Sequence, residues 1–332
     1  MADMDASRQL YGLASGFQVT QAIHVAATLR ISDLLADGPK SLPELAELTS
    51  SDPAALARLL RALTAVGLYA DTEGRYENTE LGDALRTDAP HSIAGWAWYV
   101  GQGSQWQAYG ALEHSIRTGE TAFPAVHGES LWSYRATHPP ERELFDAAML
   151  SVSKTQADAI ASAYDFGRFP TIVDVGGGRG LLLSTLLSRR SGVEGVLFDQ
   201  PAVVAGAHEV LLAAGVADRC QVAGGNFLEA VPEGSLHLLK SVLHDWTDAE
   251  AIEILRNCRR AMPADGRLLI LEQLLDQAPD PVRTAFTDLN MLVMTGGRER
   301  TTDEYRSLLA AAGLTLLRTI PTASDMFVIE AS

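Results

Sequence analysis

The stretch Thr171–Leu187, with the sequence TIVDVGGGRGLLLSTLL, decides the fold that we predict for this chain. A short apolar run ends in Gly176–Gly178 and Gly180, and a leucine-rich segment that can form a helix follows at once. A strand, a glycine turn and a helix begin a βαβ unit, in which a nucleotide-like ligand binds at the helix N-terminus. Dinucleotide sites use the spacing G-x-G-x-x-G. Here the spacing is G-x-G-x-G, because Leu181 stands where the third glycine of that motif would fall.

Two carboxylates accompany these glycines. Asp174 comes just before them, and a carboxylate there suits a ligand with a cationic or amino-acid end better than a pyrophosphate, which it would repel. Asp199 ends the next apolar run, about 20 residues past the turn, where such a carboxylate receives ribose hydroxyls. Together with Gly176 and Gly178 they predict a site for S-adenosylmethionine. A tight strand–helix turn without a ligand is the structural alternative.

From residue 171 onward, apolar strands alternate with helices. The pattern predicts an α/β fold, with a doubly wound parallel sheet that ends in an antiparallel hairpin. The expected strands are 171–176, 194–199, 220–224, 236–242, 267–273, 314–321 and 325–331. The expected helices between them are 180–190, 201–214, 248–261 and 302–312.

The N-terminal part has a different pattern. A helical zone over 8–36 is followed by one helix capped by Ser41 and another capped by Asp52, and then by a short hairpin over 68–77. Two helices followed by a hairpin are typical of a winged helix. A helix that enters the DNA major groove should be basic. The helix capped by Asp52 carries only two arginines, Arg58 and Arg61, so we expect it to serve dimerisation or packing and not DNA binding.

Composition narrows the classes of partner. The chain has 332 residues, a formal net charge of −16 and a pI near 4.9, which argue against nucleic acid and anionic membranes as partners. Cys220 and Cys258 form no CxxC pair and imply neither a disulfide framework nor a zinc site. The N-terminus lacks the features of a signal peptide, and no apolar run is long enough to span a bilayer. We therefore expect a cytoplasmic protein.

Several residues with functional chemistry follow the predicted strands. The carboxyl ends of parallel strands meet at one edge of the sheet, so these residues should lie together. Asn226 could bind an adenine edge and Phe227 could cover its face, while Lys240 and Ser241 end the fourth strand.

His244 is the most informative of the residues at the strand ends. A phenol with a pKa near 10 is a poor nucleophile at neutral pH, and a neutral imidazole with a pKa near 6.5 can take its proton. Glu272 should accept a hydrogen bond from the other ring nitrogen. A lone histidine at a strand end is more often structural, but Glu272, Glu299 and the glycine loop nearby favour catalysis. Asp245 could pair with His244 on a metal, yet no third ligand is evident, so we expect no metal.

Residues 90–165 are predicted to be helical and are unusually rich in aromatic side chains. Phe145 and Met149 are four positions apart and would share one helix face. Such side chains can form ordinary core or the wall of a pocket for a flat ligand.

The sequence resembles the S-adenosylmethionine-dependent small-molecule O-methyltransferases of the caffeic acid and hydroxyindole type, whose bacterial members work in antibiotic and pigment biosynthesis. The resemblance covers nearly the whole chain. Its motifs are DVGGGRG (174–180), FDQP (198–201), GGNF (224–227), LHDW (243–246), Glu272 and GGRERT (296–301).

The resemblance implies roles for individual residues. His244 matches the general base, and Glu272 and Glu299 match the acids beside it. The cofactor-binding positions are Asp174, Gly176, Gly178, Asp199, Asn226, Phe227, Lys240 and Ser241, and the pocket positions are Trp106, Phe145, Met149, Trp246 and Met291. The family usually has Asp where this chain has Asn226, so we expect weaker cofactor binding there.

The resemblance also implies the organisation of the chain. Residues 1–85 would form a winged-helix dimerisation domain, 86–165 a helical linker that contributes to the substrate pocket, and 166–332 a Rossmann-like, seven-stranded class I methyltransferase domain. A homodimer through the N-terminal helices follows from the same likeness.

The predicted function is methyl transfer to a hydroxyl of an aromatic small molecule in secondary metabolism. Methyl transfer to nitrogen or carbon, a hydroxylase or pericyclase that keeps the cofactor, and a ligand-sensing winged-helix regulator remain alternatives. The presence of His244, Glu272 and Glu299 argues against the hydroxylase or pericyclase and against the regulator.

Overall fold

A computed structural model describes residues 2–332, apart from the side chains of 2–4 and 155. The chain forms two compact units that interleave along the sequence. One comprises residues up to Trp106 and Glu143–Val152, and the other comprises Gln107–Arg142 and Ser153–Ser332. The three-part domain division made from the sequence stays a prediction.

The first unit begins with helices. Their bounds are α1 (Ala2–Ala14), α2 (Gly16–Thr28), α3 (Ile31–Leu34), α4 (Leu42–Thr49), α5 (Pro53–Ala65), α6 (Glu80–Asp83) and α7 (Ala94–Val100). The predicted caps are confirmed, because Ser41 and Glu44 form a capping box and Asp52 accepts a hydrogen bond from the Ala55 N–H at 2.8 Å. These caps fix where α4 and α5 begin.

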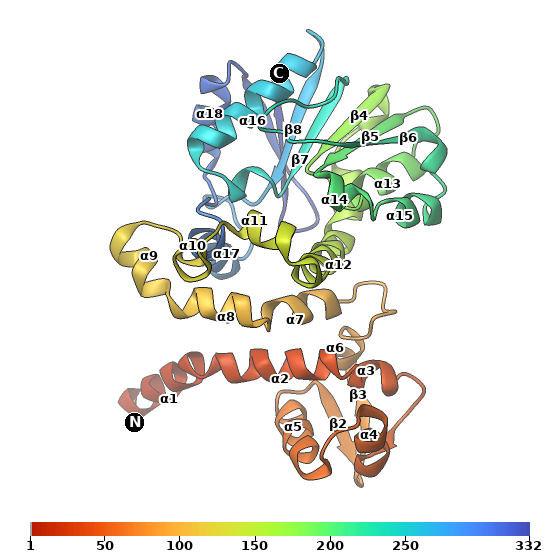
Figure 1. Ribbon diagram of the computed structural model, residues 1–332, viewed down its shortest axis with the longest axis vertical. Helices are drawn as coiled ribbons and strands as arrows, with labels where there is room; N and C mark the ends of the chain where they lie inside the picture. Colours follow the sequence, from red (N-terminus) through yellow and green to blue (C-terminus); the bar gives the residue numbers. More distant parts are fainter. Residues whose placement is uncertain (1) are drawn as a thin grey trace. The chain divides into compact units, whose positions relative to one another are not determined.

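A small sheet completes the winged helix of this unit. The predicted hairpin is present as β2 (Tyr69–Thr72) and β3 (Arg75–Asn78). A third strand, β1 (Lys40–Ser41), pairs with β3 and was not predicted. A strand of two residues is too short to show an alternating pattern of polar and apolar side chains. Figure 1 shows α4 and α5 beside this sheet. Leu45, Leu56, Leu60, Leu63 and Tyr69 are among the buried side chains that hold these elements together.

The second unit contains the large sheet. Its strand order is β6-β5-β4-β7-β8-β10-β9, with the first five strands parallel and β10 antiparallel to both of its neighbours. The bounds are β4 (Thr171–Val175), β5 (Glu194–Asp199), β6 (Cys220–Gly224), β7 (Leu236–Lys240), β8 (Arg267–Glu272), β9 (Leu316–Pro321) and β10 (Phe327–Ala331). The predicted seven-stranded sheet is confirmed. Chain order reverses between β4 and β7, which is where ligands bind in open α/β sheets.

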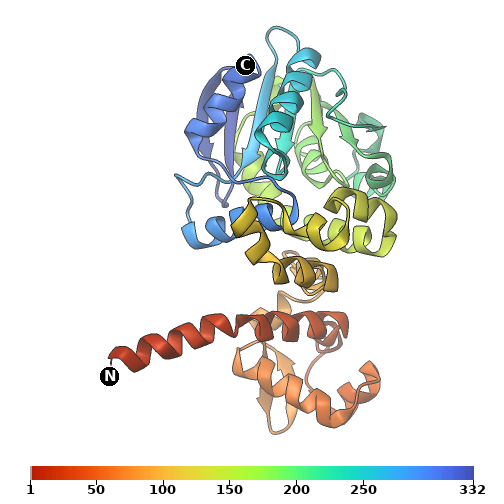
Figure 2. The same cartoon turned by 60° about the vertical axis from the view of Figure 1, so that its left-hand side comes forward.

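Helices cover both faces of this sheet. One face packs against the C-terminal part of α12 (Pro139–Ala163), α13 (Leu181–Ser188) and α15 (His208–Ala213). The other packs against α16 (Asp248–Ala261) and α18 (Thr302–Ala311), which Figure 2 draws in cyan and blue. Because side chains alternate along a strand, each strand contributes to two apolar cores.

The helices differ from the sequence-based expectation in two places. The single helix expected over 201–214 is two helices, α14 (Pro201–Val204) and α15, and Gly206 between them lies against the side chain of Arg179. A helix that we did not predict, α17 (Pro281–Met294), is capped by Asp280 and starts with a proline, which is a usual N-terminal signal.

The remaining helices of the second unit precede the sheet in the chain. They are α9 (Leu112–Thr118), α10 (Ala122–His127) and α11 (Leu131–Thr137), together with the end of α8 (Gly103–Gly110). Ala122, Phe123 and Leu131 pack with Val293 and Met294 of α17 in a separate apolar cluster. Within residues 2–332, no helix has the length and apolar character needed to cross a membrane.

Candidate active site

The glycine loop follows β4 and lies beside the end of β7. Gly176 and Gly178 have φ angles of +71° and +60°, which side chains disfavour. A Cβ on Gly176 would also come within 2.7 Å of Val242 after β7. The N–H of Gly176 donates to the Phe198 carbonyl at 2.8 Å, and that of Gly178 donates to the Asp199 carboxylate at 2.9 Å. Asp199 therefore holds the loop that the sequence analysis assigned to the cofactor.

Asp174 lies beneath this loop. A Cβ on Gly177 would meet its carboxylate at 2.7 Å. The side chain is buried, and neither oxygen forms a hydrogen bond within the described part of the chain. Burial, assisted by the Asp199 carboxylate, raises the pKa of Asp174 to about 7, against the opposing effects of Lys240 and of the Leu183 backbone N–H. A buried carboxyl without hydrogen bonds is costly, so this one is suited to a ligand that brings its own donor.

Lys240 ends β7 and carries a part-buried ammonium. Its Nζ donates to the Ser153 hydroxyl at 3.3 Å. Burial lowers its pKa, whereas the carboxylates of Glu272, Asp174 and Asp325 oppose that effect. The side chain thus supplies positive charge between the ends of β4 and β8.

Asn226 and Phe227 follow β6. The Asn226 side chain accepts from the Leu228 N–H at 3.0 Å and donates to Glu229 at 3.1 Å, so it shapes its own turn. The Phe227 ring meets the Trp246 ring edge to face, with centroids 5.6 Å apart. It also lies 3.7 Å from the position of a Cβ on Gly176. The loops after β4, β6 and β7 therefore converge here.

His244 lies on a short turn that Glu272 holds in place. Ser241 has a φ of +52°, and the chain leaves β7 there, two residues earlier than predicted. The next N–H groups, those of Val242, Leu243 and His244, all donate to Glu272 Oε1, at 3.0, 3.0 and 3.4 Å. Converging backbone N–H groups form an anion-binding nest, and the carboxylate at the end of β8 fills it.

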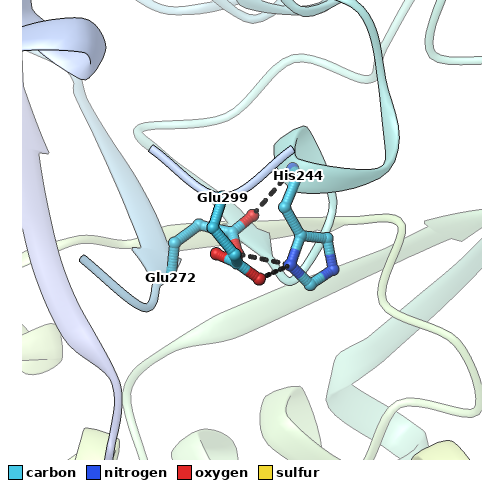
Figure 3. A group of neighbouring side chains, drawn as sticks. All are labelled: His244, Glu272 and Glu299. Carbon is cyan, nitrogen blue, oxygen red and sulfur yellow. Dashed lines mark hydrogen bonds and ion pairs between the residues drawn. The ribbon is translucent and has the colours of Figure 1, made fainter. Parts of the chain in front are cut away.

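The His244 ring is oriented by two carboxylates. Its Nδ1 lies 2.8 Å from Glu299 Oε1 and 3.3 Å from Glu272 Oε2. Figure 3 shows both acids on this nitrogen and the other ring nitrogen pointing away from them. Within residues 2–332, the one ion-pair contact of Nε2 is with a carboxylate oxygen of Asp245, 3.9 Å away. The sequence placed Glu272 at the ring nitrogen that does not take the proton. Glu272 does lie at Nδ1, but Glu299 makes the shorter contact with that nitrogen.

These charges change the proton affinity of the ring. Burial by itself lowers the pKa of His244, but Glu272, Glu299 and Asp245 outweigh it and raise that pKa to about 10. Burial in turn raises the pKa of Glu272 to about 7, although His244 opposes it. The ordinary imidazole pKa assumed in the sequence analysis is therefore wrong for this site. Protons are shared within a buried cluster of one base and its acids.

The same three side chains have a spacing that could suit a metal ion. Ligand atoms of His244, Glu272 and Glu299 lie within 4.8 Å of one another. Ligands bound to one ion at about 2.1 Å keep a separation of roughly 3 Å or more. The 2.8 Å contact between Nδ1 and Glu299 is instead typical of a charge-assisted hydrogen bond. We interpret the group as a hydrogen-bonded cluster.

The predicted pocket residues fall in both units. Trp246 stacks on Trp132 of α11, with centroids 6.1 Å apart, and Met291 is buried on α17, both in the second unit. Trp106, Phe145 and Met149 belong to the first unit, where Phe145 packs edge to face on Tyr99. Their part in substrate binding stays a prediction.

Several residues that hold the site together were not predicted from the sequence. Asp288 of α17 accepts the Glu299 N–H at 2.8 Å, and Arg300 donates to the carbonyls of the His244 turn. Trp132 was recognised only as one aromatic among many. The only sequence signal for Arg300 was its place within the GGRERT motif. Its hydrogen bonds to residues far away in the chain leave no signal in the sequence.

The chain belongs to the O-methyltransferase family. A family model described as the O-methyltransferase domain matches residues 109–315, and one described as the O-methyltransferase dimerisation domain matches residues 11–88. The protein is an S-adenosylmethionine-dependent O-methyltransferase with the class I methyltransferase fold.

Individual relatives agree with this membership. The phenazine O-methyltransferase PhzM of Lysobacter antibioticus is 43% identical, over 97% of this chain and 95% of its own length. The mitomycin biosynthesis 6-O-methyltransferase of Streptomyces lavendulae is 39% identical, over 95% of this chain and 91% of its own. The O-methyltransferase NcsB1 from neocarzinostatin biosynthesis, solved with S-adenosylmethionine and 2-hydroxy-5-methyl naphthoic acid, is 35% identical over 95% of each chain, with a TM-score of 0.81.

The residues present fit S-adenosylmethionine. The loop is open at Gly178, where a Cβ would meet no atom within 4 Å, and Asp174 offers buried carboxylate oxygens that no described protein group satisfies. A carboxylate of this kind complements the amino group of the methionine part.

Proposed function

We propose that the protein transfers a methyl group to a hydroxyl on an aromatic small molecule of secondary metabolism, with His244 as the general base. The observation that carries the proposal is the orientation of the His244 ring. Two carboxylates engage Nδ1, whereas Nε2 points away from them. A base must have a free nitrogen within hydrogen-bond reach of the proton it takes, and this arrangement leaves Nε2 for that purpose.

The carboxylates then stabilise the charge that catalysis creates. When Nε2 takes the proton of an acceptor hydroxyl, the ring becomes an imidazolium that is paired with Glu299 and Glu272. The raised pKa of His244, about 10, lies close to that of a simple phenol. Proton transfer between the two groups is then nearly balanced in free energy. The cost is that only a small fraction of the free base is present at neutral pH.

The cofactor side of the site rests on the glycine loop. When bound, S-adenosylmethionine supplies a methyl group on a sulfonium sulfur that is already activated for transfer. We assign Asp174, Gly176, Gly178, Asp199, Asn226, Phe227, Lys240 and Ser241 to its binding. Asp174 and Lys240 supply opposite charges within the same buried region, which matches a ligand that carries both an amino group and a carboxylate.

The acceptor is proposed to be flat and aromatic. Trp246, Trp132 and Phe227 form a chain of ring contacts next to the His244 turn. Rigid aromatic side chains can bind planar ligands with little loss of conformational entropy. The relatives named for phenazine and mitomycin, and the neighbour solved with a naphthoic acid, support this class of acceptor.

We also propose that the protein is a homodimer through its N-terminal helices. Leu10, Tyr11 and Leu13 of α1 and Phe17 of α2 are each more than half exposed, at 54 to 76%. Large apolar side chains gathered on one segment are typical of an interface. The match to the dimerisation domain covers this segment from residue 11. Sedimentation equilibrium of the wild type beside Leu13→Glu tests the proposal, and a wild-type monomer would contradict it.

The test of the reaction is methyl transfer from labelled S-adenosylmethionine to a panel of hydroxylated aromatics, with wild type beside His244→Ala. We expect label on a phenolic oxygen and a loss of about 10²-fold or more in kcat for the variant, with cofactor affinity retained. Label on an acceptor nitrogen or carbon would overturn the assignment to oxygen. Equal kcat in the two proteins would exclude His244 as the base. A chelator should leave kcat unchanged if His244, Glu272 and Glu299 hold no metal.

A further inference from the structure

Arg300 has an unusual environment for a charged residue. Its side chain is fully buried, and it is the largest such side chain in the described part of the protein. Its Nη1 donates to the Leu243 carbonyl at 2.7 Å, and its Nη2 donates to the Trp246 carbonyl at 2.8 Å. Nη2 and Nε also donate to one oxygen of Asp248, at 2.8 and 3.1 Å. Because a buried charge is costly unless it is paired and hydrogen-bonded, this network explains how the guanidinium is retained.

The two carbonyls that Arg300 holds lie on either side of His244. Leu243 comes directly before it, and Trp246 comes two residues after it. Asp248, the third partner, opens α16, into which this turn leads. The guanidinium is planar and rigid, so groups bound to it keep a fixed separation. Arg300 therefore sets the path of the chain through His244.

The segment 296–300 meets the His244 turn in two more ways. A Cβ on Gly297 would overlap the carbonyl oxygen of His244, so the two backbones pack directly on each other. Glu299, adjacent to Arg300, bonds Nδ1 of His244. The backbone of Arg300 is itself fixed, because its carbonyl accepts the Leu275 N–H at 3.2 Å just after β8. The segment thus holds the backbone of the turn and the ring of its histidine together.

We propose that Arg300 is a positioning residue for methyl transfer. By bridging the Leu243 and Trp246 carbonyls, it keeps Nδ1 of His244 aligned with its two carboxylates and leaves Nε2 turned toward the acceptor. The inference rests on the proposed role of His244 as the general base. Within residues 2–332 the hydrogen bonds of the Arg300 guanidinium go to Asp248 and to backbone carbonyls and not to the His244 ring, so we infer that Arg300 acts through the backbone.

Arg298 provides a matched control. It lies on the same segment and bonds the same Asp248 at 2.9 Å, together with Glu304 at 2.7 Å. Its side chain is 45% exposed and forms no recorded hydrogen bond to a carbonyl of the turn within residues 2–332. A variant at this position removes an ion pair with Asp248 but keeps the hydrogen bonds from Arg300 to the two carbonyls of the turn. Any effect specific to Arg300 must then come from the two carbonyls.

The kinetic test compares Arg300→Met, Arg300→Lys and Arg298→Met. We expect Arg300→Met to lower kcat by about 10²-fold, the usual scale for misplacing a catalytic group by about 1 Å. Arg300→Lys keeps the charge but not the planar fork, and we expect it to recover only part of kcat. Cofactor affinity measured by calorimetry should stay within about twofold, because the glycine loop is untouched. Arg298→Met should keep the wild-type kcat.

A spectroscopic test reads the ring without turnover. Nitrogen-15 NMR of labelled histidine follows Nδ1 and Nε2 of His244 in the free protein. In Arg300→Met we expect changed nitrogen-15 chemical shifts of the His244 ring and a lower midpoint for its titration, because Nδ1 loses its alignment with Glu272 and Glu299. Asp245 is the third acid that faces the ring. Wild-type ring signals and kcat in a folded Arg300→Met protein would overturn the inference. If that variant does not fold, the same comparison applies to Arg300→Lys. The NMR result stands even if no acceptor is ever methylated.

Discussion

The glycine loop after β4 and the histidine turn after β7 are neighbours in the sheet, but they are held in opposite ways. The loop depends on backbone conformation and on Asp199, and the carboxylate of Asp174 beneath it forms no hydrogen bond within the described chain. The turn is tied by Glu272, Glu299 and Arg300, which occupy its N–H groups, its ring and its carbonyls.

Under the proposed function, this difference separates the region that binds the cofactor from the region that carries the general base. The loop keeps unsatisfied polar atoms that a ligand can complete, which makes the cofactor part of the local structure. The N–H groups of the turn, its histidine ring and two of its carbonyls are held before any ligand arrives, although one oxygen each of Glu272 and Glu299 has no hydrogen bond within the described residues. We therefore propose that the histidine is preorganised for the reaction. Substitutions in the turn should therefore alter kcat, and substitutions at the loop should alter cofactor affinity.

The largest effect is expected for Glu272→Gln. Three N–H groups require an acceptor at the position of Oε1, so the amide oxygen must take that place. The amide NH2 then faces Nδ1 of His244 and favours a proton on Nε2, the nitrogen that should be free. We expect kcat to fall about 10²-fold with cofactor affinity unchanged. Steady-state kinetics and calorimetry measure the two quantities. A variant with wild-type kcat would show that Glu272 does not set the tautomer.

The next effect concerns pH, and Glu299→Gln tests it. Free base at Nε2 increases with pH up to the pKa of about 10, so kcat of the wild type should rise between about pH 7 and 9. An amide oxygen at position 299 can still accept from Nδ1 but carries no charge. The kcat profile should therefore move to lower pH, by about one unit. Glu272 and Asp245 remain as the other acids that face the ring. An unmoved profile would mean that the observed limb does not report His244.

The same shift has a consequence for stability. Because folding raises the pKa of His244 from 6.5 to about 10, its ion pairs stabilise the folded state fully below pH 6.5. That stabilisation is lost as the pH rises through about 10. In Glu299→Gln the stabilisation below pH 6.5 should be smaller and its loss should be complete at a lower pH, because only the folded-state pKa of His244 changes. Denaturant titrations at several pH values would show both effects.

The smallest effect is expected at the loop, for Asp174→Asn. The amide removes a charge that a cationic ligand group would use, and we expect the cofactor Kd to rise about tenfold, or ~1.4 kcal/mol. Folding raises the pKa of Asp174 to about 7, so its ionisation destabilises the free protein as pH rises through that value. The variant cannot ionise, so the free protein should be at least as stable as wild type at pH 8. Thermal unfolding with and without cofactor measures both quantities, and an unchanged Kd would mean that no ligand group meets Asp174.

Much of the second unit could be predicted because local and global patterns agree there. The central strands of the large sheet are short apolar runs, and the glycines after β4 predict the edge at which a ligand binds. Continuous periodicity also caused an error, since the pattern over 201–214 does not reveal that Gly206 breaks the helix against Arg179. The two-residue strand β1 is defined by pairing with β3 and by no property of its own sequence.

The members of the site could be named from the sequence, but their geometry could not. Motif positions identify His244, Glu272 and Glu299, yet they do not say that both acids face one ring nitrogen. The raised pKa of His244 follows from that shared position and from burial, which appear only in three dimensions. Arg300 shows the same limit, because its partner Leu243 is 57 positions away in the chain.

The close packing of Gly297 on the His244 carbonyl also restricts how this enzyme can be altered by directed evolution. A saturation library at position 297 should yield almost no active clones, because any side chain pushes the turn and its histidine out of place. Position 298, one residue away and half exposed, should accept nearly every amino acid. Libraries intended to change the acceptor are better placed at Trp132 of α11 and Met291 of α17, which we expect to lie near the acceptor and which are outside the turn.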